Sequence, residues 1–173
     1  IYSFSNLEDE YTKRYKDTAF CFRSIFDLSD IEAVELARED NLDIAIDLMG
    51  YTKGNRMNIF SYRVAEFQIS YLGFPCTTGS KEIDYLIGDK VIIPEKYRKF
   101  YSEKILYMPN CYMPYDDTRK ISDIKYTRSD FNLPNNSFVL AAFHKNYKIT
   151  PMEIKAWSRL LKKIPNAILW ISE

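Results

Sequence analysis

Residues 137–151 read SFVLAAFHKNYKITP, and this stretch decides the fold. Residues 137–142 form an apolar run of the length expected for a buried strand. Thr150 and Pro151 suit the N-cap and the first position of a helix, and Glu153 completes a capping box three residues after the cap. The stretch therefore predicts a strand, a loop and a helix in succession, which is the repeating unit of an α/β sheet.

The loop between this strand and this helix holds the only histidine of the chain and two lysines. Backbone N–H groups at a helix N-terminus are free to meet an anion, and open α/β sheets bind ligands beyond the carboxyl ends of their strands. We therefore expect a phosphate-facing loop that includes His144, Lys145 and Lys148. An ordinary surface loop with solvated lysines is the alternative on spacing alone.

The overall composition argues against several classes of protein. Basic and acidic residues balance at 24 each, unlike a general nucleic-acid-binding or membrane-surface protein. The three cysteines are far apart and show no metal-ligand spacing, so we expect neither a disulfide framework nor a metal site, and a reducing cytoplasm fits. No apolar segment approaches the roughly 18 residues of a membrane-spanning helix. Because the chain starts with Ile1 and stops after an apolar run, we expect an internal piece of a longer polypeptide.

Strand and helix patterns alternate along the chain, which predicts parallel, doubly wound sheets. The expected helices cover residues 8–18, the segment that follows the Ser29 capping box, 55–66 and 151–163. The expected strands cover residues 1–5, 22–28, 42–48, 67–72, 83–87, 91–93, 105–108, 137–142 and 167–171. In the last helix, we expect a core-facing stripe of Ile154, Trp157, Leu161 and Ile164.

Two further loops follow predicted strands. Residues 50–56 read GYTKGNR, with Lys53 between two glycines, and residues 73–79 read GFPCTTG. Glycine permits positive φ and close approach of the backbone, and the carboxyl ends of parallel strands share one edge of the sheet. Together with the loop of residues 143–151, these loops should therefore share one edge of a sheet, where ligands bind, although plain turns account for the glycines equally well.

Six motifs in a fixed order carry a resemblance to a known family. They are DLMGYTKGNR (47–56), QISYLGFPCTTG (68–79), IDYLIGDKVIIP (83–94), YSEKILYMPNCYMP (101–114), FHKNYKITP (143–151) and LLKKIPNAILW (160–170). Together they closely resemble the catalytic region of protein O-GlcNAc transferases, the O-GlcNAc transferase and SPINDLY-like members of glycosyltransferase family 41. The resemblance covers nearly the whole chain and is weakest in residues 1–40.

The resemblance implies a partial GT-B architecture with Rossmann-like, doubly wound parallel sheets. Residues 1–128 would be the latter part of the N-terminal catalytic domain, and residues 129–173 the start of the C-terminal domain that binds the UDP-sugar. Family members transfer N-acetylglucosamine from UDP-GlcNAc to Ser or Thr hydroxyls of proteins, with inversion and without a required metal or cofactor. The implied partners are a nucleotide-sugar donor, a protein acceptor and tetratricopeptide repeats in the same full-length chain, with no nucleic acid and no membrane.

The resemblance also assigns site residues. The family's Tyr-Lys pair falls on Tyr147 and Lys148, and Lys148 would contact the diphosphate of the donor as a catalytic residue. Leu72 and Gly73 would line the sugar pocket, with Thr77 in the same loop. Lys53 would lie near the point where donor and acceptor meet.

The sequence departs from the family pattern at several positions. His144 and Lys145 stand where the family usually has asparagine and glutamine, and both add a possible positive charge near the pyrophosphate. Cys76 replaces the usual glycine of the Tyr-Pro-Gly-Thr loop. The family's upstream His-Pro loop and downstream Gly-His-Thr-Thr-Gly segment would lie outside these residues, so we expect that the 173 residues alone do not transfer sugar.

Two other interpretations stay open at this point. One keeps the fold and changes the sugar, as in a protein fucosyltransferase that uses GDP-fucose or a relative that glucosylates asparagine. The other is a non-catalytic module that only binds protein partners. His144, Lys145 and Cys76 leave room for the module, whereas the Tyr147–Lys148 pair and Lys53 argue against it.

Overall fold

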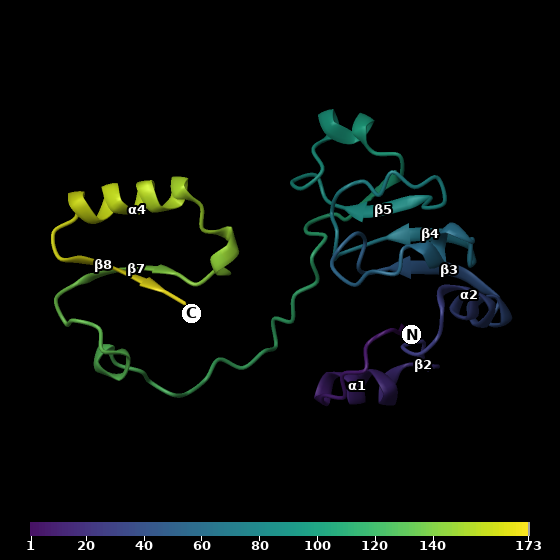
Figure 1. Ribbon diagram of the computed structural model, residues 1–173, viewed down its shortest axis with the longest axis horizontal. Helices are drawn as coiled ribbons and strands as arrows, with labels where there is room; N and C mark the ends of the chain where they lie inside the picture. Colours follow the sequence, from purple (N-terminus) through teal and green to yellow (C-terminus); the bar gives the residue numbers. More distant parts are fainter. Residues whose placement is uncertain (173) are drawn as a thin grey trace. The chain divides into compact units, whose positions relative to one another are not determined.

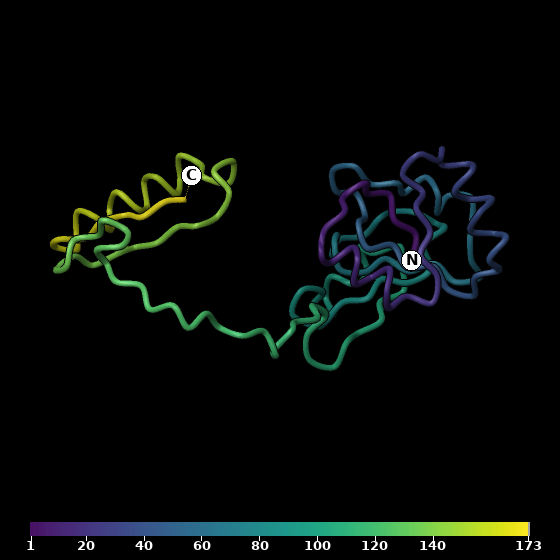
Figure 2. The backbone as a smooth tube through the Cα atoms, turned by 90° about the horizontal axis from the view of Figure 1, so that it is seen from below, coloured from purple at the N-terminus to yellow at the C-terminus, as the bar shows by residue number. Residues whose placement is uncertain are grey.

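The computed structural model describes residues 1–172, which form two compact units. The first unit covers residues 1–117 and the second begins at residue 118. Residues 108–127 contain neither helix nor strand and form an irregular connecting segment (Figure 2). The boundary expected after residue 128 falls within the short 3-10 helix η2 (Arg128–Phe131), which is part of the second unit.

Strands and helices alternate along the first unit from β1 to β4, and no helix separates β4 from β5 (Figure 1). In chain order they are β1 (Tyr2–Ser3), α1 (Glu10–Thr18), β2 (Arg23–Ser24), α2 (Asp30–Glu39), β3 (Leu42–Asp47), α3 (Asn58–Ser61), β4 (Ala65–Ser70), β5 (Tyr85–Gly88), the 3-10 helix η1 (Glu95–Phe100) and β6 (Lys104–Tyr107).

The main sheet of the first unit has the order β3-β4-β5-β6, and every neighbouring pair is parallel. Strands β1 and β2 form a separate parallel pair. This confirms the predicted α/β class with parallel sheets. Because the strands are parallel, the loops that follow β3 and β4 leave from the same edge of the sheet.

Helix α2 begins with the capping box predicted at Ser29, whose backbone and side chain both bond to Glu32. Its apolar side buries Ala33, Val34 and Ala37 in the core that also contains Ala45 of β3. A second core cluster contains Leu86, Ile93 and Ile105. Burial of such side chains is the main driving force for packing helices against a sheet.

Two predicted elements of the first unit are wrong. The helix expected over residues 55–66 is only the four-residue α3, because Arg63 has a φ of 56° and turns the chain directly into β4. The strand expected over residues 91–93 is a turn. Its cause is Asp89, whose carboxylate accepts the backbone N–H groups of Val91 and Ile92. Short aspartate-centred turns of this kind compete with strand pairing.

The second unit contains η2, β7 (Phe138–Ala142), the 3-10 helix η3 (Asn146–Lys148), α4 (Pro151–Lys163) and β8 (Ala167–Ile171). Strands β7 and β8 pair in parallel over five residues each, and α4 connects them. The sequence predicted these two strands and this helix, including the Thr150 cap. In the expected stripe, Trp157, Leu161 and Ile164 are half-buried, whereas Ile154 is 48% exposed.

Candidate functional site

The loop between β7 and α4 forms an open hollow in the second unit. Its lining residues are Phe143, His144, Lys145, Asn146, Tyr147, Lys148 and Ser172, around a volume of about 680 Å³. The loop contains the 3-10 turn η3, in which the backbone N–H of Lys148 donates to the carbonyl of Lys145 over 2.9 Å. This hollow brings together four residues singled out from the sequence, His144, Lys145, Tyr147 and Lys148.

The basic side chains of this hollow are exposed to solvent. The Lys148 ammonium lies 5.9 Å from the ring centroid of Tyr147, within the range of a cation–π interaction, and Tyr147 is itself 81% exposed. The imidazole of His144 meets Trp157 of α4 edge-on, with 5.9 Å between ring centroids. The loop therefore presents positive charge and an aromatic ring outward, which suits contact with an anionic ligand.

We expected free backbone N–H groups at the start of α4 that could bind an anion, but side chains of the helix start already occupy them. The N–H of Met152 donates to the Thr150 hydroxyl over 3.2 Å, and the N–H of Thr150 donates to the Glu153 carboxylate over 2.9 Å. Hydrogen bonds from the side chain and backbone of Thr150 hold the pKa of Glu153 below its ordinary value. The helix start is thus already capped and carries a negative charge, so Lys145 and Lys148 supply the positive charge of the loop.

In the first unit, the loops that follow β3 and β4 contact each other closely. The N–H of Tyr71 donates to the carbonyl of Asp47 over 2.9 Å, and the rings of Tyr51 and Phe74 meet edge-on with centroids 5.7 Å apart. A Cβ atom on Gly73 would come within 2.2 Å of the carbonyl oxygen of Leu48. Glycine is therefore required at residue 73 for the two loops to approach each other.

This interlocked pair of loops carries Lys53 after β3, and Leu72 and Gly73 after β4. Lys53 is exposed between two glycines that both have positive φ, 54° at Gly50 and 81° at Gly54. Leu72 also has a positive φ of 72°, which is uncommon for a branched side chain and marks a backbone held by its surroundings. The loops after β3 and β4 therefore meet at one edge of the main sheet, as expected. The third loop expected at that edge follows β7, which belongs to a separate sheet, so this part of the prediction is wrong.

Thr77 does not join that group. Its hydroxyl donates to Glu103 over 2.7 Å and lies 3.2 Å from the hydroxyl of Ser102, just before β6 starts. Thr78 bonds to the same carboxylate through both its backbone N–H and its hydroxyl. Glu103 is 4% exposed, so this cluster is a buried structural contact that holds the loop after β4 against the start of β6.

Two buried acids near the loops were missed in the sequence, Glu103 and Asp47. Burial would raise the pKa of Glu103, but hydrogen bonds from Thr78 and Thr77 hold it below its ordinary value. For Asp47, at the end of β3, burial raises the pKa despite N–H donors from Met49 and Gly50. The available signal for Asp47 was an acidic residue at the end of the strand LDIAID, three residues before a glycine.

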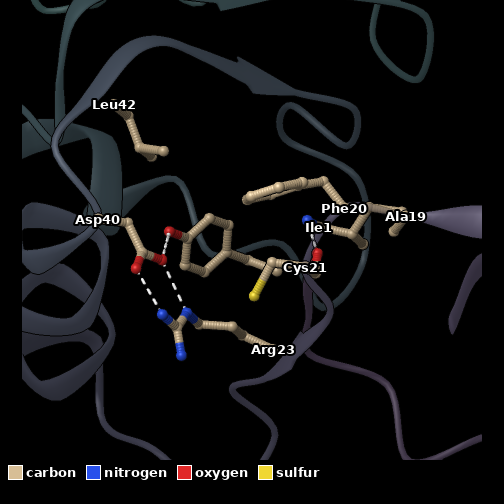
Figure 3. A pocket seen from close by; sticks show the side chains of 8 residues that line it. Ile1, Ala19, Phe20, Cys21, Arg23, Asp40 and Leu42 are labelled. Atoms are coloured by element: carbon tan, nitrogen blue, oxygen red, sulfur yellow. Dashed lines mark hydrogen bonds and ion pairs between the residues drawn. The ribbon is translucent and has the colours of Figure 1, made fainter.

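A second hollow of about 420 Å³ lies near the N-terminus of the first unit (Figure 3). Its lining includes a hydrogen-bonded group of three side chains. The carboxylate of Asp40 accepts hydrogen bonds from the guanidinium of Arg23 and from the phenol of Tyr2. Arg23, followed by Tyr2, lowers the pKa of Asp40 to about 2. These polar groups satisfy one another, and the rest of the lining includes Phe20, Cys21 and Leu42.

Among residues 1–172, no group of three or more His, Cys, Asp or Glu side chains is arranged to hold a metal ion. Within the same range, none of the helices has the length and apolar character needed to cross a bilayer.

Comparison with known proteins decides the family. The family model described as Glycosyl transferase family 41 matches residues 1–126 and 117–173, which together span the chain. The chain belongs to glycosyl transferase family 41. This confirms the resemblance seen in the motifs, and the family is one of glycosyltransferases.

Family 41 relatives align along nearly the entire chain. The probable UDP-N-acetylglucosamine–peptide N-acetylglucosaminyltransferase SEC of Arabidopsis thaliana is 37% identical over 172 residues, which is 96% of this chain and 18% of that protein. The corresponding SPINDLY protein of the same plant is 27% identical, over 98% of this chain and 19% of its own length. The chain therefore spans about a fifth of the length of these family 41 relatives.

A solved family 41 relative has the same fold. An O-GlcNAc transferase mutant from Thermobaculum terrenum superimposes with a TM-score of 0.81 and 26% sequence identity, over 98% of this chain and 31% of the other. This agreement confirms the α/β fold of the GT-B type, of which the 173 residues form a part.

Proposed function

We propose that the intact protein transfers N-acetylglucosamine from UDP-GlcNAc to Ser or Thr hydroxyls of proteins. Membership of family 41 and the names of the SEC and SPINDLY relatives support this donor and a peptide acceptor. The observation that carries the proposal is the exposed basic loop of the second unit, where Lys145 is the N-cap of η3 and Lys148 is its last residue. Its Tyr147–Lys148 pair matches the family motif.

In this proposal, Lys148 stabilises the leaving group. As the bond between the sugar and the diphosphate breaks, negative charge grows on the phosphate oxygen that departs. An ammonium held close to that oxygen interacts more strongly with the transition state than with the bound substrate, and such differential stabilisation raises the turnover number. Since Lys148 lies in a turn fixed by backbone hydrogen bonds and is followed by a capped helix, the peptide that carries it is well ordered.

The chemistry of the proposal requires no metal ion, because lysines can neutralise the diphosphate. The acceptor hydroxyl would attack the anomeric carbon from the side opposite to the diphosphate, which inverts that centre. Lys53, Leu72 and Gly73, on the interlocked loops, would contribute to the sugar and acceptor side. We further propose a cytoplasmic protein with tetratricopeptide repeats outside these 173 residues, and no transfer by the 173 residues alone.

The test uses the intact protein and compares Lys148→Ala with Lys155→Ala. Lys155 is an exposed lysine of α4 in the same unit but outside the hollow, so it is a matched control for loss of one charge. We expect Lys148→Ala to lower kcat with UDP-GlcNAc by about 10²–10³, the usual effect of removing one electrostatic donor. Lys155→Ala should leave kcat unchanged.

Three donors should be compared in the same assay, namely UDP-GlcNAc, UDP-glucose and GDP-fucose. Turnover of GDP-fucose or UDP-glucose in place of UDP-GlcNAc would replace the proposed sugar by one of the related transfers. Equal turnover in Lys148→Ala and the unmodified protein would remove the central role of Lys148.

A further inference from the structure

The carboxylate of Asp47 ties down the start of the loop that carries Lys53. One carboxylate oxygen accepts the N–H of Met49 over 3.1 Å, and the other accepts the N–H of Gly50 over 2.6 Å. Asp47 is only 8% exposed. Both oxygens are therefore used by consecutive peptide groups, which fixes the orientation of the backbone at the exit from β3.

The conformation fixed in this way is the one that the neighbouring loop requires. Gly50 has a φ of +54°, and a Cβ atom there would come within 2.2 Å of the Cβ of Phe74. The carbonyl of Leu48 lies equally close to the Cβ position of Gly73. Rotation of either peptide tied by Asp47 would therefore push against the loop that holds Leu72 and Gly73, since close-packed contacts leave no room for it.

The carboxylate of Asp47 serves two backbone N–H groups with two oxygens. Burial of a carboxylate is unfavourable, and it raises the pKa of Asp47. Serine or asparagine would avoid the cost of a buried charge, but each offers only one oxygen acceptor. The buried charge therefore accompanies a turn in which the orientations of both peptide groups are fixed.

We propose that Asp47 is a positioning residue for sugar transfer, acting by holding the Lys53 loop against the loop of Leu72 and Gly73. This inference rests on the proposed function, because Lys53, Leu72 and Gly73 are the residues assigned there to the sugar and acceptor side. Asp47 is buried and both of its carboxylate oxygens accept backbone N–H groups, so the role assigned to it is to position the loop and not to contact the substrate. Removal of the Asp47 carboxylate should displace Lys53 and so slow the catalytic step, because small displacements of reacting groups lower the rate.

Ser70 provides a matched control on the neighbouring strand. It is the register partner of Asp47, is 1% exposed, and its hydroxyl has no hydrogen-bond partner within residues 1–172. Because side chains of paired residues in parallel strands point to the same face, Ser70 shares the environment of Asp47. Ser70→Ala removes a buried polar group without untying the loop.

The experiment measures hydrogen exchange and kinetics in the intact protein with Asp47→Asn and Ser70→Ala. In Asp47→Asn, we expect the amides of Met49 and Gly50 to exchange at least about tenfold faster, because the new amide group faces an N–H donor in place of one oxygen. The amide of Ile69 in β4 should remain protected, which shows that the unit is still folded. With UDP-GlcNAc, kcat should fall about tenfold or more, while the dissociation constant of UDP should stay within about twofold. Ser70→Ala should match the unmodified protein in every measurement.

Several outcomes would overturn the inference. Fast exchange at Met49 and Gly50 with unchanged kcat would reduce Asp47 to a structural residue, and unchanged exchange would show that Asp47 does not hold the loop. If Asp47→Asn fails to fold, Asp47→Ser is tested in its place, since serine removes the buried charge and keeps one acceptor. An unchanged kcat in Asp47→Ser would likewise refute the positioning role of Asp47. An unmodified protein that does not use UDP-GlcNAc would instead refute the proposed function, and with it the role assigned to Asp47.

Discussion

Replacement of Glu103 by glutamine tests whether Thr77 is held for structure or is available to a substrate. In the structure, the Glu103 carboxylate accepts hydrogen bonds from the Thr77 hydroxyl and from the hydroxyl and N–H of Thr78. Glutamine has nearly the same shape, but it carries no charge and replaces one acceptor oxygen by an NH₂ group. The substitution therefore weakens the tie with little change in packing.

The expected magnitude follows from the number and kind of these bonds. Hydrogen bonds to a charged group contribute about 1.5–3 kcal/mol each, and neutral ones about 0.5–1.5 kcal/mol. The N–H of Thr78 keeps an oxygen acceptor in glutamine but loses the charge, and the Thr77 hydroxyl can turn to accept from the new NH₂ group. We expect a net cost of about 2 kcal/mol for local opening around Thr78, which corresponds to about 30-fold faster exchange.

Hydrogen exchange of the Thr78 amide measures this cost directly, because that N–H donates to Glu103 over 2.6 Å. Glu103 has a lowered pKa, so its stabilisation is complete above the ordinary pKa of glutamate and is lost as the pH falls through the lower folded value. The difference between the two proteins should therefore be full at pH 7 and shrink below about pH 4. Equal protection of Thr78 in both proteins at pH 7 would show that the charge of Glu103 does not hold this loop, and would contradict the structural role given to the cluster.

Two further predictions concern buried or paired polar groups of the first unit. Gln68 is fully buried and bonds to the N–H of Val64 and the carbonyls of Phe60 and Glu82, so Gln68→Leu should lower the free energy of unfolding by about 3–5 kcal/mol. Urea denaturation checks this, with Glu66→Gln, at an exposed residue of the same strand, as a control expected within about 0.5 kcal/mol. Asp40 has its pKa lowered to about 2, chiefly by Arg23, so its stabilisation is present above its ordinary pKa near 3.8 and is lost as the pH falls toward 2. Protection of the Ile25 amide, which pairs β1 with β2, should fall over that range, and constant protection from pH 5 to 2 would contradict the ion pair.

The local chemistry of the chain predicted the second unit well. The capping box at Thr150, the proline that follows it and the apolar runs on either side locate β7, α4 and β8, because each signal acts over only a few residues. The helix expected over residues 55–66 failed for the opposite reason. Its sequence is compatible with a helix, but Arg63 adopts a positive φ and donates to Asp84 and to backbone carbonyls of distant residues. Tertiary contacts of this kind do not appear in a local pattern.

The candidate site was predictable only to the level of loops. Parallel strands require that the loops after β3 and β4 share an edge, and the glycines at 50 and 73 showed where the backbone could come close. The sequence does not reveal which atoms meet there. Asp47 and Glu103 were missed because one acidic residue at the end of a strand, or directly before one, has no distinctive spacing. Thr77 was grouped with the site although its partner lies 26 residues away.

The same residues that predict α4 also limit how the loop before it can bind an anion. A strong capping box uses the first backbone donors of the helix, and Glu153 adds a negative charge at the point where the helix dipole is positive. An uncapped helix start would attract a phosphate through its backbone, but here the attraction must come from the side chains of Lys145 and Lys148. Lysine is a flexible point charge exposed to solvent, so its interaction with a diphosphate is screened by salt and depends on what closes over it. It follows that the affinity of the intact protein for UDP should fall with ionic strength, and should do so more weakly in Lys148→Ala.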